Sequence, residues 1–121
     1  INSVLKSIKL VYKREKIFCI FQPHRISRVN DLREEFTKCF NYADKVILCP
    51  IFSAGEKIKL NFNYTNFAKD IIRKSSVDLI MIQNENDLLK YIKQNIFGTN
   101  IVIGLGAGSI SNWLKILKDK I

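Results

Sequence analysis

The run Phe21–Arg28 (FQPHRISR) holds the side chains best suited to chemistry: the imidazole of His24 and the guanidinium groups of Arg25 and Arg28. Guanidinium groups bind carboxylate and phosphate oxygens through paired, charge-assisted hydrogen bonds. The run directly follows an apolar stretch that predicts a buried strand, and open α/β sheets bind ligands beyond the carboxyl ends of their strands. The pattern therefore predicts a site for an anionic group. The alternative is that both arginines are solvated loop charges and that His24 is a turn residue after Pro23.

A second segment, FSAGE at residues 52–56, places the carboxylate of Glu56 on a glycine-containing loop of a basic chain. This carboxylate could orient Arg25 or Arg28, or it could meet an amine or a metal-bound water. The alternative is a solvated loop carboxylate with no further role.

A third segment, Gly104–Gly108 (GLGAG), separates an apolar stretch from an amphipathic one. Glycines let a backbone turn sharply and approach a ligand, and the start of a helix offers unpaired N–H groups to an anion. Gly106, Ala107 and Gly108 are therefore candidates to line the same crevice. The segment is not a full dinucleotide-binding fingerprint, and a tight turn between a strand and a helix is the alternative.

Several catalytic patterns are absent from the sequence. It has no GxxxxGK[ST] phosphate loop, no nucleophile elbow and no paired-histidine metal motif, and it contains one His. Cys19, Cys39 and Cys49 fit neither a disulfide framework nor a zinc site, so we expect buried free thiols in a reducing, cytoplasmic compartment. The chain therefore offers candidate binding groups, with no candidate catalytic or metal-ligating residue.

The elements that must position these segments alternate between strand and helix. Strands are predicted at Ile17–Phe21, Lys45–Cys49, Val77–Ile82 and Ile101–Ile103. Helices are predicted over residues 2–13, from a capping box at Asp31, around residues 67–72, from a cap at Asn84, and after Gly108. This order predicts an α/β three-layer sandwich, a mostly parallel sheet with helices on both faces. Loops after parallel strands emerge at one edge, so residues 22–30, 51–56 and 104–108 should be neighbours.

The 121 residues suffice for a single domain with its own core. No apolar run is long enough to span a membrane and no signal peptide is recognisable, so no membrane partner is expected. The net charge of +9 raises nucleic acid as a partner, but the cations are dispersed and no nucleic-acid-binding module is recognisable. The first residue is Ile1 rather than Met, which suggests a domain cut from a larger protein.

The three segments, in this order and at about these intervals, resemble the carboxy-terminal domain of the Mur ligases, and within them the members that add L-alanine. The matching stretches are FQPHRISRVNDL (Phe21–Leu32), FSAGE (Phe52–Glu56) and GAGSI (Gly106–Ile110). The family pattern reads FQPHRYxRTRDL, YxAGE and GAGDI. Ile26, Phe52 and Ser109 depart from it, and each departure removes a hydroxyl or a charge.

The resemblance implies an ATP-dependent ligase that joins L-alanine to UDP-N-acetylmuramate in peptidoglycan precursor synthesis. In that family ATP and Mg²⁺ activate a carboxylate as an acyl phosphate, which the amine of L-alanine attacks. His24, Arg25 and Arg28 would bind the alanine carboxylate and the phosphates, while Glu56 and Gly106–Gly108 would shape the crevice. The central domain, outside this chain, would bind most of the ATP and Mg²⁺, and the amino-terminal domain would bind the UDP sugar.

The resemblance also implies that residues 1–121 form one carboxy-terminal domain that lacks its first strand and is inactive alone. Two other interpretations stay open. One is a basic α/β module that binds nucleotides or RNA without catalysis. The other is a decayed or regulatory copy of the ligase domain that only mediates association.

Overall fold

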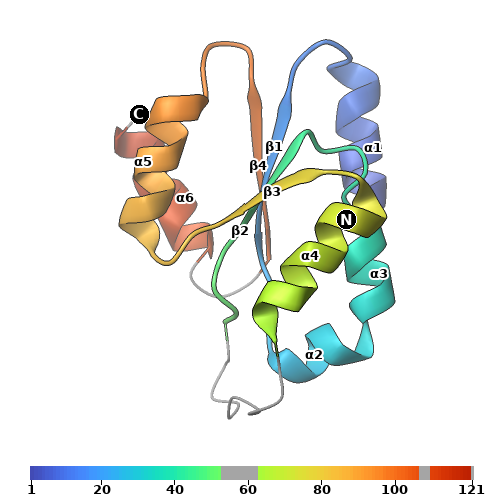
Figure 1. Cartoon of the computed structure of the whole chain (residues 1–121). Coiled ribbons are helices and arrows are strands. Elements are labelled where there is room, and N and C mark those ends of the chain that lie inside the picture. The colour runs from blue at the N-terminus through green and yellow to red at the C-terminus, as the bar shows by residue number, and fades with distance from the viewer. Residues whose placement is uncertain (53–62, 107–109, 121) are drawn as a thin grey trace.

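A parallel sheet lies at the centre of this computed structural model, which describes residues 1–52, 63–106 and 110–120 (Figure 1). Within these residues the strands are β1 (Ile17–Gln22), β2 (Lys45–Leu48), β3 (Asp78–Met81) and β4 (Ile101–Gly106). Their order across the sheet is β3-β2-β1-β4, and every neighbouring pair is parallel. The predicted parallel sheet is therefore confirmed.

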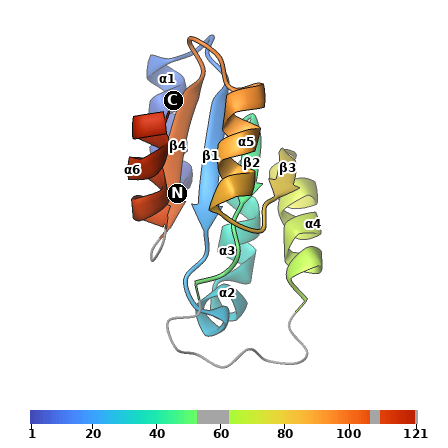
Figure 2. The ribbon, with the colours of Figure 1, turned by 90° about the vertical axis from the view of Figure 1, so that its left-hand side faces the viewer.

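Helices cover both faces of the sheet, as Figures 1 and 2 show. One face carries α1 (Asn2–Val11), α3 (Arg33–Lys38) and α4 (Tyr64–Ser75), and the other carries α5 (Glu85–Asn95) and α6 (Ile110–Lys120). The short helix α2 (Ile26–Asp31) lies beyond the carboxyl ends of the strands. This arrangement confirms the expected α/β three-layer sandwich.

Two apolar clusters, one on each face, explain why β1 is a continuous apolar run. Successive side chains of a strand point to opposite faces. Phe21 packs in the cluster under α1, α3 and α4, whereas Ile20 packs with Leu88 under α5 and α6. Every residue of β1 is buried, as expected for a central strand covered on both sides. The central position of β1 places the loop with His24, which follows it, at the carboxyl edge of the sheet.

The helix predicted to open at Asp31 is present as α3, but the capping box predicted at Asp31 is wrong. Asp31 is the last residue of α2, and α3 begins after Leu32, whose side chain makes no capping hydrogen bond. The reason lies upstream, where Arg25 takes a left-handed backbone conformation and the Val29 N–H donates to the Arg25 carbonyl at 3.2 Å. That turn starts a helix five residues before the capping box.

The glycine-rich segment belongs partly to β4, which runs to Gly106 instead of ending at Ile103. A Cβ placed at Gly104 would lie 2.3 Å from Leu114 Cδ1. Glycine at this position therefore lets α6 pack closely against β4. The other three strands lie within one residue of their predicted bounds.

The predicted helices lie near their predicted positions, but their ends and buried faces differ locally from the prediction. The Asn84 cap is confirmed, because its side chain accepts the Asp87 N–H at 2.9 Å. Phe67, Ala68 and Ile71 face the core, but Ile72 is 42% exposed. The first helix ends at Val11, so Tyr12 lies beyond it and is not part of the buried face.

Candidate functional site

The residues after β1 form a short extended segment at the carboxyl edge of the sheet. Pro23 interrupts the strand because it has no N–H to donate, and His24 then makes a parallel bridge with Phe52. The Arg25 N–H donates to the Phe52 carbonyl at 2.8 Å, and the Phe52 N–H donates to the Pro23 carbonyl at 2.9 Å. The loops after β1 and β2 are therefore neighbours, as predicted.

His24 is held in place by its neighbour across this bridge. Its ring stacks on the ring of Phe52, with centroids 5.5 Å apart and an interplanar angle of 15°. The end of β2 is itself anchored, because the Tyr64 hydroxyl donates to the Cys49 carbonyl. Burial raises the pKa of the Tyr64 hydroxyl above its usual range, so the hydroxyl stays protonated and able to donate well above neutral pH. The imidazole is therefore a positioned group on an anchored loop.

Arg25 has the least common backbone conformation of the site. Its φ is +64°, in the left-handed region that non-glycine residues rarely adopt. The residue is exposed, and with His24, Ser27, Asp31 and Leu32 it lines an open depression of about 440 Å³. Strained, exposed residues of this kind gather at ligand sites. The depression combines a guanidinium, an imidazole and the carboxylate of Asp31, which the sequence had indicated only as a helix cap.

A second depression adjoins the first and shares His24. It measures about 360 Å³ and is mainly apolar; its walls include Phe21, Pro23, Phe36 and Gly106. Of the crevice candidates Gly106, Ala107 and Gly108, the structure describes Gly106, which lies beside Gln22 of β1 as expected. The structure thus brings His24 and Gly106 to one edge of the sheet.

Gln22 is a structural organiser of this edge that sequence reasoning missed. Its side chain is buried, its Nε2 donates to the Pro50 carbonyl at 3.1 Å, and its Oε1 accepts the Ile110 N–H at 3.0 Å. One amide thus joins the ends of β1 and β2 to the start of α6. The Ile110 N–H is therefore satisfied, although we expected unpaired N–H groups for an anion at this helix start. A polar residue ending an otherwise apolar strand was the available signal.

Several predicted site positions lie outside the residues that the structure describes. These are Glu56, Ala107, Gly108 and the side chain of Arg28, whose backbone belongs to α2. Across residues 1–52, 63–106 and 110–120, no three His, Cys, Asp or Glu side chains are close enough together to hold a metal ion. No described helix is long and apolar enough to cross a membrane.

The described part of the site is suited to binding. Arg25 offers donors to a carboxylate or phosphate, and His24 offers a ring nitrogen beside it. The depression is open, so a ligand held there would need a second surface to exclude water. Domain closure over a substrate is the usual way to provide one.

Comparison with proteins of known sequence gives close relatives along the entire chain. A UDP-N-acetylmuramate–L-alanine ligase of Pelagibacter ubique is 54% identical over 121 residues, which are 100% of this chain and 26% of that protein. The ligase of the same name from Ruegeria sp. is 32% identical over 124 residues, again 100% of this chain and 26% of its own length. The chain thus spans about a quarter of these relatives. No family model matches it.

Solved structures share the fold at low sequence identity. A murein peptide ligase of Psychrobacter arcticus matches 98% of this chain and 24% of its own, with a TM-score of 0.75 and 12% identity. The second structure is a domain from Haemophilus ducreyi that is described as part of a candidate UDP-N-acetylmuramate:L-alanyl-gamma-D-glutamyl-diaminopimelate ligase. The match covers 98% of this chain and 79% of that domain. Its TM-score is 0.66 and its identity 10%. The chain is about a quarter as long as its relatives. Because the sequence matches extend along the whole of this chain and the fold agrees with them, the chain belongs to the Mur ligase family.

Proposed function

We propose that this chain is the carboxy-terminal domain of an ATP-dependent ligase that joins L-alanine to UDP-N-acetylmuramate. The proposal extends the name of the relatives to the protein that contains this chain. In it, residues 1–121 supply binding groups to a reaction whose other parts lie elsewhere in the protein. His24, Arg25 and Arg28 are the groups we assign to the amino acid carboxylate and the phosphates.

The arrangement of Arg25 is the observation that carries the proposal. Its backbone is held by the hydrogen bond to Phe52 in a conformation that costs free energy, and its side chain is exposed beside an open depression. A conformation of this kind persists only where the surrounding structure enforces it. A guanidinium presented in this way can bind a carboxylate once a neighbouring domain closes over it and excludes water.

ATP and Mg²⁺ belong to the rest of the protein in this proposal. The sequence has no phosphate loop, and the described residues hold no cluster of metal-ligating side chains. We therefore assign the nucleotide and the metal to the rest of the protein. Its contribution is to hold the carboxylate of L-alanine, and to place positive charge where the activated carboxylate carries negative charge.

The proposal is tested in the full-length protein with Arg25→Ala. Loss of a hydrogen bond to a charged group costs about 1.5–3 kcal/mol, so kcat/KM for L-alanine should fall roughly 10- to 150-fold. If Arg25 binds the ground state and the transition state equally, the change should lie in the KM for L-alanine, with little change in kcat or in the KM for ATP.

The matched control is Arg73→Ala, which removes an exposed guanidinium from α4, on a different element. It should leave the kinetics unchanged. Unchanged kinetics in Arg25→Ala as well, or equal losses in the two variants, would remove the assignment. Ligation by residues 1–121 alone, without the rest of the protein, would contradict the proposed division of labour.

A further inference from the structure

The end of the molecule opposite His24 and Arg25 exposes large apolar side chains. We call it the amino-edge tip, and it consists of the end of α1 with the loop 12–16, and the loop 96–100. Leu10, Val11, Tyr12 and Phe97 are 62%, 73%, 45% and 67% exposed. The two loops meet because the Ile101 N–H donates to the Lys16 carbonyl at 2.8 Å, and Figures 1 and 2 both show them at the same end. These apolar groups therefore lie at one end of the molecule, although they come from two distant parts of the sequence.

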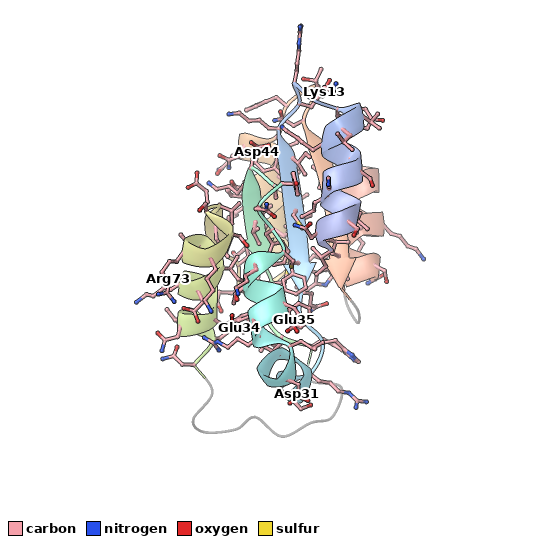
Figure 3. The ribbon with its side chains drawn as sticks, turned by 90° about the vertical axis from the view of Figure 1, so that its right-hand side faces the viewer. Lys13, Asp31, Glu34, Glu35, Asp44 and Arg73 are labelled. Atoms are coloured by element: carbon pink, nitrogen blue, oxygen red, sulfur yellow. The ribbon has the colours of Figure 1, made fainter. Side chains whose placement is uncertain are left out.

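Positively charged side chains lie at the same end as these apolar groups. Lys13, Arg14 and Lys16 are exposed in the first loop, and Lys93 is exposed in the last turn of α5, just before the second. Figure 3 shows Lys13 extending away from the molecule at the end opposite Asp31. The amino-edge tip thus combines aliphatic, aromatic and cationic side chains.

Carboxylates at this end compensate only part of the positive charge. Asp44 accepts the Ile17 N–H at 2.7 Å and lies 3.9 Å from Lys9 Nζ, so its charge is already engaged. Glu15 is half-buried next to Arg14, and Asp78 is exposed at the start of β3. The exposed cations of the loop 12–16 therefore face solution without an equal number of exposed carboxylates beside them.

We propose that the amino-edge tip binds the surface of an anionic lipid bilayer. Interfacial segments of this kind insert aliphatic and aromatic side chains between headgroups while Lys and Arg remain at the phosphates. The charge is complementary to anionic lipid. The exposed apolar side chains come from the end of α1 and from two loops at one end, and Leu10, Val11, Tyr12 and Phe97 line none of the depressions described above. Leu10 and Val11 are aliphatic, and exposed aliphatic side chains are suited to an acyl-chain interface rather than to stacking on nucleic-acid bases.

This inference does not depend on the proposed ligase function. The site of His24 and Arg25 lies at the carboxyl edge of the sheet, so a bilayer at the amino edge leaves it open to solution. The sequence-based expectation of no membrane partner rested on the lack of a spanning segment, which does not bear on peripheral binding.

The test is co-sedimentation of the full-length protein with phosphatidylcholine vesicles, with and without phosphatidylglycerol. We expect binding to the anionic vesicles alone, and weaker binding as salt rises. The variants L10S/V11S and K13E/R14E should each lower the partition coefficient by about tenfold or more, since each removes one of the two contributions. Both pairs are exposed, and circular dichroism checks that the variants stay folded.

The matched control is K69E/I72S on α4, which changes one exposed cation and one apolar side chain that is 42% exposed. It should bind vesicles like the unaltered protein. Absence of binding to anionic vesicles, as expected if the rest of the protein covers this end, would overturn the proposal. So would equal binding by all variants, or a gel shift with short RNA that depends on Lys13 and Arg14 while vesicles are not bound.

Discussion

At the scale of single residues, Arg25 is the position where structure and proposed function are most closely joined. The left-handed conformation costs a non-glycine residue about 1–2 kcal/mol, and here it turns the chain from the bridge with Phe52 into α2. Glycine would adopt this φ without that cost. Arginine at this position therefore makes the fold less stable than glycine would, which is expected where the side chain is needed for binding.

Arg25→Gly separates these two effects. Relief of the backbone strain outweighs the added freedom of glycine in the unfolded chain, so the free energy of unfolding should stay equal or rise by up to about 1 kcal/mol. The kcat/KM for L-alanine in the full-length protein should still fall as in Arg25→Ala. Urea unfolding and steady-state kinetics measure the two quantities. A destabilised Arg25→Gly variant would show that the side chain supports the fold.

Gly106 is constrained by both conformation and space. Its φ is +140°, and a Cβ placed there would lie 2.3 Å from the Gln22 carbonyl oxygen. Gly106→Ala should therefore lower the free energy of unfolding by more than about 1–3 kcal/mol, because backbone strain adds to overpacking. Gly98→Ala is the control, since Gly98 has a φ of +43° but no heavy atom within 4 Å of its Cβ position. Equal costs in urea unfolding would show that the contact with Gln22 is relieved easily.

At the scale of secondary-structure elements, α3 and α4 are joined by side chains of opposite charge. Arg33 Nη2 lies 2.8 Å from Asp70 Oδ2, and its guanidinium lies 5.5 Å from the centre of the Phe67 ring. Lys74 Nζ lies 2.6 Å from Glu34 Oε1, and Figure 3 shows Glu34 and Arg73 on these neighbouring helices. These pairs align the two helices that cover one face of the sheet.

The variant Asp70→Asn tests this link through the pH dependence of the free energy of unfolding. The hydrogen bond from Arg33 lowers the pKa of the Asp70 carboxyl group. A carboxyl group with a lower pKa in the folded state stabilises the fold above its unfolded pKa, and this contribution is lost as pH falls through the folded pKa. The free energy of unfolding of the variant should therefore be lower by up to about 1 kcal/mol at neutral pH. It should approach that of the unaltered protein as the pH falls below about 4. Urea unfolding across this range measures it.

Asp78→Asn serves as the control for the change of charge, because Asp78 is exposed at the start of β3. Its effect should be smaller at neutral pH than that of Asp70→Asn. A loss in Asp70→Asn that persists undiminished at acid pH would show that packing, rather than the ion pair, joins the helices.

At the scale of the whole molecule, burial in the folded core lowers the reactivity of the cysteine thiols. It raises the pKa of Cys19 and Cys49 to about 12, and that of Cys39 to about 11. Cys19 and Cys49 are buried as expected, whereas Cys39 is only partly buried. The thiolate is the reactive form, so all three thiols should be poorly reactive at pH 8.

Titration with a chromogenic disulfide reagent tests this expectation. In the native protein Cys39 should react first, and Cys19 and Cys49 should react only at the rate of unfolding. All three should react within the mixing time in denaturant, which serves as the internal control. Rapid reaction of Cys19 in the native protein would mean that the core opens readily.

The alternation of apolar strands with amphipathic helices was sufficient for the fold, because periodicity records which side chains must leave water. It placed β1, and the local pattern placed the N-cap of α5, since an N-cap needs only residues a few positions apart. It failed at Asp31, where a capping box is present but Arg25, turned by a contact with Phe52, starts the helix earlier. It also failed at Gly104, whose role depends on Leu114 of a packed helix.

For this protein, the sequence by itself determined the layered α/β architecture, the edge at which His24 and Arg25 lie, and the family. Only the tertiary structure decided which groups meet there, namely the stacking of His24 on Phe52 and the hydrogen bonds of Gln22. It also decided that Leu10 and Phe97 are exposed at the opposite end. The physical reason is range. Hydrophobic periodicity acts between near neighbours in the chain, whereas a site is made by side chains that only the packed sheet brings together.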